Sequence, residues 1–463
     1  MAQRIALLNI VGLTPSLLCD ATPALVEFAR RCGGIRSVIP DLPAVTCTVQ
    51  NSILTGARPS AHGIVGNGWF DRTQNEVQFW KQSNGLVQAP RIWDLARARD
   101  PSVTTANLFW WHAMYSSADI TVTPRPIYCA DGRKVPDVWT NPPSWRDELR
   151  AEIGAFPLFH FWGPAADIRS TEWIARAAMM TVAKFDPTLT LVYLPHLDYA
   201  LQKYGPSDLR IRGDLREIDR VFAVLLKFFD DRGIRVSVVS EYGISTVSGA
   251  VHLNRVLRDA GFLALRDELG REMLDAGASR AFAVCDHQVA HVYVASEGDC
   301  AEVQHILEAT PGVDSVLDAP AKKAAGIDHE RSGDLVAITT ADRWFAYPWW
   351  RDDARAPDFA RTVDIHRKPG YDPCELFLDP AAPFPGARAR LALRLLQRTL
   401  GMRALLDVIP LDASLVRGSH GRVERAHAIR PLLIVDDADH DDLEIHASHV
   451  LPFLMRQLFG RAG

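Results

Sequence analysis

The stretch TLTLVYL, residues 188–194, decides the fold because it is a short, almost continuous run of apolar and β-branched residues. An amphipathic helix is expected after it, with the apolar residues between Ile211 and Phe229 on one face and Gly233 just past its end. RVSVVS, residues 235–240, is typical of a second buried strand. Strands of this kind that alternate with helices predict an α/β protein whose mostly parallel sheet is covered by helices on both faces.

The beginning of the chain shows the same alternation of strand and helix. RIALLNI, residues 4–10, has the composition of a buried strand. The segment TPALVEFARRCGG at 22–34 predicts a helix, because Thr22 suits the N-cap, Pro23 suits the first helical position and Gly33 suits a left-handed end. The first strand and helix of the sheet are therefore expected within the first 34 residues.

Residues 250–345 have a different pattern from the rest of the chain. FAVCDHQVAHVYV at 282–294 predicts two short strands, DCAEVQHILEAT at 299–310 predicts a helix, and GVDSVLDA at 312–319 predicts another strand. We therefore expect a small α+β subdomain over 250–345, inserted between elements of the core, which resumes near PLLIV at 431–435.

Composition and charge narrow the functional classes. The chain of 463 residues has 23% charged residues and a net charge of −5, which does not favour binding to a nucleic-acid polymer. Its seven cysteines include no Cys-x-x-Cys pair and suit free thiols in a reducing compartment. The chain has no apolar run of about 18 residues, and the run at 5–8 is too short for a signal peptide. We therefore expect a cytoplasmic protein without a membrane span.

Polar residues follow the predicted strands at the points where these strands end. Ligands of open α/β sheets bind at the carboxyl ends of the strands, so these residues are candidates for a functional site. The candidates are Thr46 and Asn67 in the loop 43–71, His196, Asp198 and Gln202 after 188–194, Glu241 and Tyr242 after 235–240, and His420 in a Gly-flanked loop.

Four separated segments carry a resemblance to a known family. They are SILTGARPSAHGIVGNGWFD at 52–71, LDYALQKYGP at 197–206, VSEYGIS at 239–245 and GSHG at 418–421. In order and spacing they resemble the nucleotide pyrophosphatase/phosphodiesterase branch of the alkaline phosphatase superfamily. The resemblance implies an alkaline-phosphatase-like α/β domain over residues 1–463, within which the subdomain 250–345 is inserted.

The resemblance also implies a chemistry and a set of site residues. Family members hydrolyse phosphate esters with two zinc ions, which activate a nucleophile and bind the phosphoryl oxygens. By position, Thr46 corresponds to the nucleophile and Asn67 to the side chain that donates to a phosphoryl oxygen. Asp198 and His420 correspond to ligands of one zinc ion, and Glu241 corresponds to a ligand of the other.

Three positions depart from the family's ligand set. Val11 stands where a carboxylate is expected and has no ligand atom. Gln202 and Tyr242 stand where imidazoles are expected, although an amide is a poor zinc ligand and a phenol binds a metal well only when it is ionised. We therefore expect at most one divalent ion (zinc, manganese or magnesium) on Asp198, Glu241 and His420; a protein with no metal is the alternative.

Some polar residues could replace the missing ligands in binding a substrate. Lys368, in the loop VDIHRKPGYDPCELF at 363–377, could supply positive charge, and His196 could act as a base. Tyr242 is expected to form part of the pocket wall. The alternative interpretations are a solvated surface charge for Lys368 and a structural histidine for His196.

The sequence therefore leaves more than one function open. The first hypothesis is a hydrolase that acts on a phosphate mono- or diester of a small molecule, with Thr46 as the nucleophile. The second is a catalytically impaired relative that binds a phosphorylated metabolite or a protein partner. The third retains catalysis without metal ions and uses Lys368 or His196.

Overall fold

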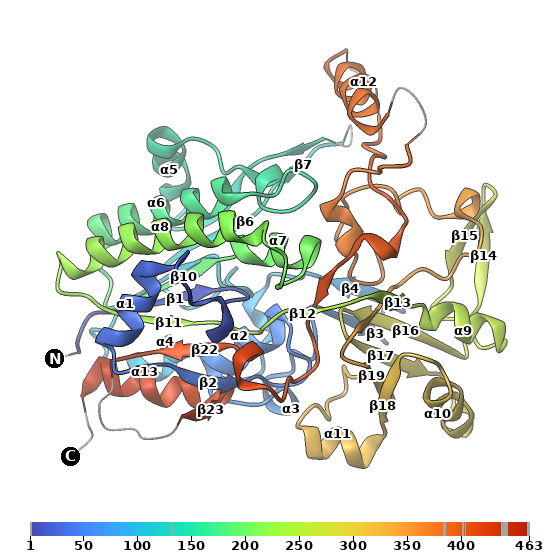
Figure 1. The fold of residues 1–463 in the computed structure, drawn as a ribbon, viewed down its shortest axis with the longest axis horizontal. Helices are drawn as coiled ribbons and strands as arrows, with labels where there is room; N and C mark the ends of the chain where they lie inside the picture. Colours follow the sequence, from blue (N-terminus) through green and yellow to red (C-terminus); the bar gives the residue numbers. More distant parts are fainter. Residues whose placement is uncertain are drawn as a thin grey trace.

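The computed structural model describes residues 2–130, 133–382, 386–400, 402, 404–436 and 443–460. Within these residues, one sheet of nine strands forms the centre of the molecule (Figure 1). The strands, in their order across the sheet, are β23 (Glu444–His446), β2 (Arg36–Ile39), β22 (Leu432–Ile434), β11 (Arg235–Val239), β1 (Ile5–Ile10), β10 (Leu189–Leu194), β5 (Thr105–Leu108), β6 (Ile120–Pro124) and β9 (Val138–Asn141).

The centre of this sheet is parallel, as the buried apolar strands predicted. Strand β1 pairs in parallel with β10 and β11, and β10 and β6 pair in parallel with β5. Antiparallel pairing is confined to the two contacts of β22 and to the edge strand β9. The sequence therefore predicted the mostly parallel α/β fold correctly.

Helices cover both faces of the sheet. Figure 1 shows α1 (Pro23–Arg31), α6 (Ile168–Phe185) and α8 (Ile211–Asp230) on one side. On the other side lie α4 (Ile92–Arg99) and α13 (Val450–Phe459). The predicted helices at 22–34 and 211–229 are thus confirmed.

The start of α1 differs from the expected capping. Thr22 occupies the N-cap position, but its side chain makes no capping hydrogen bond and instead donates to the carbonyls of Leu17 and Cys19. The amides of Ala24 and Leu25 donate to the carboxylate of Asp219, 3.1 and 2.9 Å away. Because α8 packs on α1, a carboxylate distant in sequence satisfies the first turn of α1.

A second, smaller sheet lies beside the first. It has four antiparallel strands in the order β16 (Ala281–Asp286), β17 (Val289–Val294), β19 (Leu335–Thr339) and β18 (Val313–Leu317), with α10 (Cys300–Glu308) packed on it. These elements agree with the strands and the helix expected between 282 and 319. Its apolar cluster also takes in Phe79 and Trp350, from outside 250–345, so the subdomain boundaries stay a prediction.

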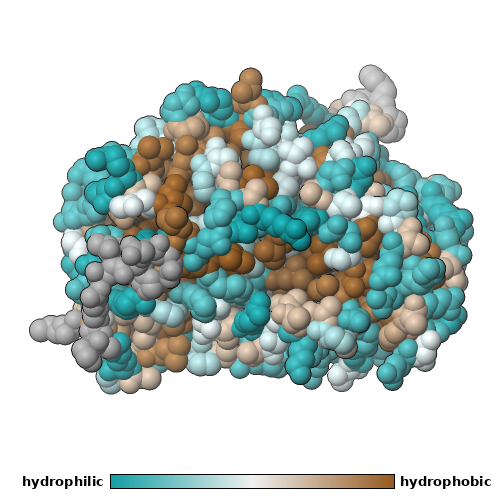
Figure 2. Space-filling model, turned by 60° about the horizontal axis from the view of Figure 1, so that its bottom comes forward, coloured by the Kyte–Doolittle hydropathy of each residue, from teal (hydrophilic) through white to brown (hydrophobic). Residues whose placement is uncertain are grey.

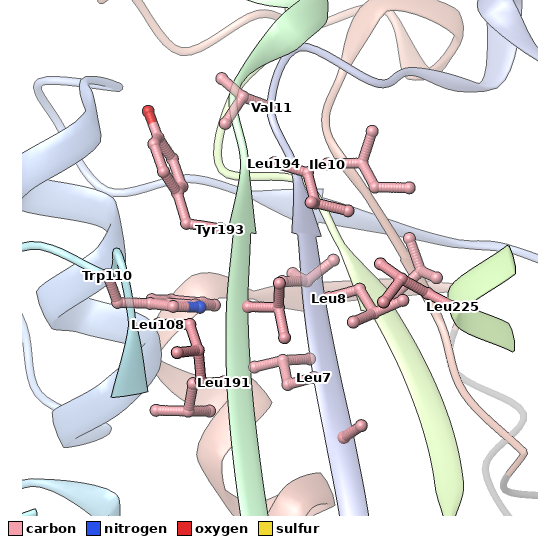
Figure 3. Close-up of a cluster of buried hydrophobic side chains, with 14 of the residues drawn as sticks. Leu7, Leu8, Ile10, Val11, Leu108, Trp110, Leu191, Tyr193, Leu194 and Leu225 are labelled. Carbon is pink, nitrogen blue, oxygen red and sulfur yellow. The ribbon is translucent and has the colours of Figure 1, made fainter. Parts of the chain in front are cut away.

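The apolar core reaches the ends of the central strands and stops there. Figure 3 shows Leu7 and Leu191 of β1 and β10 packed below Val11 and Tyr193. Val11 is fully buried, whereas the Tyr193 hydroxyl points away from the leucines. The boundary between core and site therefore falls at the carboxyl ends of these strands.

The surface is mixed in character. On the face turned forward in Figure 2, polar residues cover most of the surface, and hydrophobic residues gather in patches between them. No helix in the part of the chain that the structure describes is long and apolar enough to cross a membrane.

Candidate active site

A cavity of about 550 Å³ opens at the carboxyl ends of β10 and β11. Its wall includes four residues predicted for the site, which are Thr46, Asp198, Tyr242 and His420. Glu241 lies fully buried beside Tyr242. The fold therefore brings these segments, distant in sequence, to one cavity, at the sheet edge where ligands of such folds bind.

Thr46 is the first residue of α2 (Thr46–Thr55). Its Oγ1 lies 3.2 Å from the hydroxyl of Tyr242, which donates to Asp198 Oδ1 at 3.1 Å. Because Tyr242 donates its only hydroxyl proton to Asp198, the Thr46 hydroxyl is the donor to Tyr242. A helix N-terminus carries partial positive charge, so an anion in front of Thr46 is favoured by α2.

The turn after β11 fixes the position of Tyr242. A Cβ atom added at Gly243 would lie 1.8 Å from the carbonyl oxygen of Ile429, so only glycine fits there. The Tyr242 ring stacks on the His420 ring with centroids 3.6 Å apart. The phenol is therefore held between His420 and the two groups that its hydroxyl contacts.

Asp198 is satisfied by two neutral donors. Besides Tyr242, the side-chain amide of Gln202 donates to Asp198 Oδ2 at 2.8 Å. The Gln202 carbonyl accepts from the Tyr371 hydroxyl, also at 2.8 Å. Burial raises the pKa of Asp198 to about 7, and the hydrogen bonds from Tyr242 and Gln202 oppose that rise.

Glu241 has a similar environment. Its Oε2 accepts from the amides of Asn9 at 2.6 Å and Gln50 at 2.8 Å. Burial raises the pKa of Glu241 to about 8, and the hydrogen bonds from the side-chain amides of Asn9 and Gln50 offset part of the rise. Glu241 is thus held by neutral side chains, without a lysine or arginine partner among the residues that the structure describes.

His420 is a neutral imidazole with one nitrogen unused. Its Nδ1 lies 2.8 Å from the carbonyl oxygen of Ala44 and donates to it. Its Nε2 is buried, has no hydrogen-bond partner among the residues that the structure describes, and lies 4.0 Å from Asp198 Oδ1. Burial lowers the pKa of His420 to about 3, so Nε2 keeps its lone pair at neutral pH.

Asn67 is not among the residues that line the cavity. Its side-chain carbonyl accepts from the amide of Cys47 at 3.0 Å, and its side-chain amide donates to Asp286 at 3.1 Å. The backbone amide of Asn67 also donates to Asp286, at 2.8 Å. Asn67 therefore links the start of α2 to β16, which gives it a role in positioning Thr46.

Lys368 and His196, which the sequence suggested as substrate-binding residues, do not line the cavity. The ammonium of Lys368 is buried against Asp372 at 2.7 Å and Glu375 at 2.8 Å, and these carboxylates neutralise its charge. His196 is the first residue of α7 (His196–Tyr204) and faces α8. Its Nε2 lies 3.2 Å from a carboxylate oxygen of Asp214 and 3.3 Å from one of Glu217, both in α8.

Several residues of the site were not among the sequence candidates. Asn9 is the one polar residue of the buried strand β1, Gln50 follows Thr46 by one helical turn, and Asp286 ends the predicted strand at 282. Asn9 and Asp286 are polar side chains in otherwise apolar strands, and that signal could have indicated them, whereas Gln50 lies in a helix rich in polar residues and carries no such signal. His287 and Tyr371 also line the cavity, and their rings stack with centroids 3.6 Å apart.

The residues present do not fit a pair of zinc ions. Val11 offers no ligand atom, the Gln202 amide is engaged with Asp198 and Tyr371, and burial raises the pKa of Tyr242 well above 10. Among the residues described, one group of three histidine, cysteine or carboxylate side chains has ligand atoms within 4.8 Å of one another. That group is His196, Asp214 and Glu217, outside the cavity.

Comparisons with known proteins identify the family of this chain. The model of the family described as type I phosphodiesterase / nucleotide pyrophosphatase matches residues 5–372. The chain therefore belongs to the type I phosphodiesterase / nucleotide pyrophosphatase family. Members of this family are typically zinc-dependent phosphoesterases. This chain differs from the ligand set expected for them at Val11, Gln202 and Tyr242.

Individual relatives are distant. An uncharacterized pyrophosphatase/phosphodiesterase of Schizosaccharomyces pombe is 22% identical over 231 residues, which are 49% of this chain and 41% of that protein. This chain thus spans less than half the length of that curated relative.

Two solved structures share the fold. Phosphonoacetate hydrolase from Sinorhizobium meliloti, in complex with phosphonoacetate, has a TM-score of 0.63 and 15% identity, over 98% of this chain and 95% of that one. Murine ectonucleotide pyrophosphatase / phosphodiesterase 5 has a TM-score of 0.58 and 14% identity, over 99% and 96%.

Replacing Glu241 with glutamine should stabilise the protein at alkaline pH. The pKa of Glu241 is about 8 in the folded protein and 4.5 ordinarily. The raised pKa of Glu241 therefore makes a favourable contribution to the free energy of unfolding. This contribution is complete below pH 4.5, where the carboxyl group is protonated, and is lost as the pH rises towards 8. Glu241→Gln avoids that loss, so its free energy of unfolding should exceed that of the wild type at pH 8, on the order of 3 kcal/mol, with little difference at pH 4.5.

Denaturant unfolding at the two pH values measures this difference. Glu76→Gln, at an exposed position of β4 (Glu76–Phe79), is the matched control and should change stability at neither pH. A Glu241→Gln protein less stable than the wild type at pH 8 would show that the carboxylate has a cationic partner in solution.

Metal content should be below two zinc ions per chain. After dialysis against metal-free buffer, elemental analysis is expected to find one ion or none, because Val11, Gln202 and Tyr242 leave too few ligands for a pair. His420→Ala should abolish retention of any single ion at this site. Two zinc ions retained by the wild type would contradict this account of the site.

Proposed function

We propose that the chain hydrolyses a phosphate ester with Thr46 as the nucleophile, and that it does so without a zinc pair. The observation that carries the proposal is the hydrogen-bonded series from Thr46 through Tyr242 to Asp198, at 3.2 and 3.1 Å, in the wall of the cavity. A nucleophilic hydroxyl next to a buried carboxylate is the arrangement that general-base activation requires.

The series supplies a route for the proton of the nucleophile. The Thr46 proton passes to the Tyr242 oxygen while the Tyr242 proton passes to Asp198. The Thr46 oxygen bonds to phosphorus as the bond between phosphorus and the ester oxygen breaks. The departing ester oxygen then takes a proton from solvent. Water then cleaves the phosphothreonine and returns a proton to solvent, while Asp198 returns its proton through Tyr242 to Thr46.

The charges around Thr46 favour slow turnover. Among the residues that line the cavity, Lys134 is the one lysine or arginine, and it lies 3.3 Å from the carboxylate of Asp364. The transferring phosphoryl group is therefore stabilised mainly by the N-terminus of α2, in place of two dications. We expect a rate below the range of about 1 to 1000 per second that is usual for enzymes.

A second candidate function is binding without turnover. Asp198 and Glu241 each accept hydrogen bonds from two neutral donors, so neither carboxylate requires a metal ion to satisfy it. That observation favours a relative that binds a phosphorylated small molecule in the same cavity. The two functions differ in turnover. A hydrolase loses its activity when the Thr46 hydroxyl is removed, whereas a protein that only binds the ligand has no turnover to lose.

Replacing Thr46 with alanine should abolish hydrolysis of nitrophenyl phosphate mono- and diesters, because the attacking oxygen is removed. Thr48→Ala is the matched control, since Thr48 lies in the same helix and its buried hydroxyl has no hydrogen-bond partner in the described part of the chain. It should leave the rate unchanged. Turnover that survives Thr46→Ala would exclude Thr46 as the nucleophile, and no turnover by the wild type would leave binding as the function.

Replacing Tyr242 with phenylalanine tests the proton route. The ring and its stacking on His420 are kept, while the hydroxyl between Thr46 and Asp198 is lost. We expect kcat to fall about 100-fold or more with little change in KM. The wild-type rate should rise with pH through about 7, the pKa of Asp198, because only the ionised carboxylate accepts the proton. An unchanged kcat in Tyr242→Phe would contradict the route.

A further inference from the structure

The cavity above Thr46 is walled largely by aromatic and aliphatic side chains. Trp80 and Trp111 pack edge to face with ring centroids 5.3 Å apart, and Trp162 packs against Tyr199 and Tyr371 on another side. These rings offer broad apolar surfaces with fixed orientation, the kind of surface that holds the organic part of a ligand.

The charged groups of the wall are already compensated. The ammonium of Lys134 donates to the carbonyl of Val363 at 2.9 Å and to Asp364 at 3.3 Å. Burial lowers the pKa values of His287 and His366, so both imidazoles are neutral at pH 7. Among the described wall residues, no unpaired cation is available for a second phosphate group.

Apolar residues continue from the cavity to its rim. Helix α12 (Ala387–Thr399) contributes Leu391 and Leu395 to the wall, one turn apart on the same side of the helix. Leu395 is 48% exposed, and two further wall residues, Phe159 and Leu405, are 50% and 47% exposed. Exposed apolar side chains that are contiguous with a cavity mark a path for an apolar ligand.

The position of α12 agrees with such a path. Figure 1 shows α12 projecting above the rest of the molecule, away from both sheets. Its residues and the segment that follows supply six of the exposed large hydrophobic side chains, which are Leu393, Leu395, Leu396, Leu400, Met402 and Leu405.

We infer that the cavity takes a phosphate ester whose organic group is large, uncharged and apolar, an alkyl or an aryl group. The phosphate lies at Thr46, and the organic group lies between the tryptophans and the leucines of α12. This inference rests on the proposed function for the position of the phosphate. Hydrolysis would consume one water and release the apolar alcohol and the phosphate.

Binding measurements on the Thr46→Ala protein test the class of ligand independently of turnover. Calorimetric titration with butyl, hexyl and octyl phosphate, each below its micelle concentration, should show affinity rising about 2- to 4-fold per added methylene. Naphthyl phosphate should likewise bind at least about 10-fold more tightly than AMP or ATP. Affinity that does not depend on chain length, or tighter binding of ATP, would overturn the inference.

Two variants of α12 localise the apolar contact. Leu395→Ser should weaken octyl phosphate binding about 3- to 10-fold and leave butyl phosphate unchanged. Leu393→Ser is the matched control, because Leu393 is 53% exposed on the same helix and does not line the cavity. Equal effects of the two variants would show that the helix, rather than the Leu395 contact, is responsible.

A last comparison separates the sources of the ligand and the two proposals. The rate of hydrolysis is measured for octyl phosphate in solution and for an alkyl phosphate of longer chain in phosphatidylcholine vesicles. Comparison of the two rates shows whether the protein takes its substrate from water or from a lipid surface. Chain-length-dependent binding without hydrolysis by the wild type would refute the proposed function and uphold the ligand class. Hydrolysis of nitrophenyl esters without chain-length dependence would do the reverse.

Discussion

The burial of Asp198 between neutral hydrogen-bond donors is the constraint on which the rest of the site depends. A carboxylate that is removed from water needs a cation, a proton or several hydrogen bonds. Here Tyr242 and Gln202 each donate to one of its oxygens, and Tyr371 in turn holds Gln202. The two residues that replace expected imidazole ligands therefore perform a defined task, which is to satisfy the carboxylate that a metal ion would otherwise neutralise.

The same replacement occurs at the second carboxylate of the site. Glu241 receives its hydrogen bonds from Asn9 and Gln50, and Val11 removes the further carboxylate that a second ion would need. Loss of ligands alone would leave buried charges without partners, which costs several kcal/mol of stability per group. At both carboxylates, neutral side-chain donors supply hydrogen bonds in place of such partners.

The sequence predicted the fold and part of the site for a physical reason. Buried parallel strands are continuous apolar runs, so the strands at 189–194 and 235–239 were recognisable, and the residues just after them had to lie at one edge of the sheet. The contacts that assign roles join residues far apart in the chain. Asn67 binds Asp286, 219 positions away, and its part in holding α2 could not be inferred from local pattern.

The apolar cavity and the neutral site are consistent with each other. Polyphosphates require several cations, and the described wall of this cavity has a single lysine that is already paired with Asp364. A site that lacks such charge gains affinity from burial of apolar surface, which increases with the size of the organic group and is independent of ionic strength. In this chain the tryptophans of the wall and the leucines of α12 offer such apolar surface in the same cavity as Thr46, and the proposed ligand class follows from that arrangement.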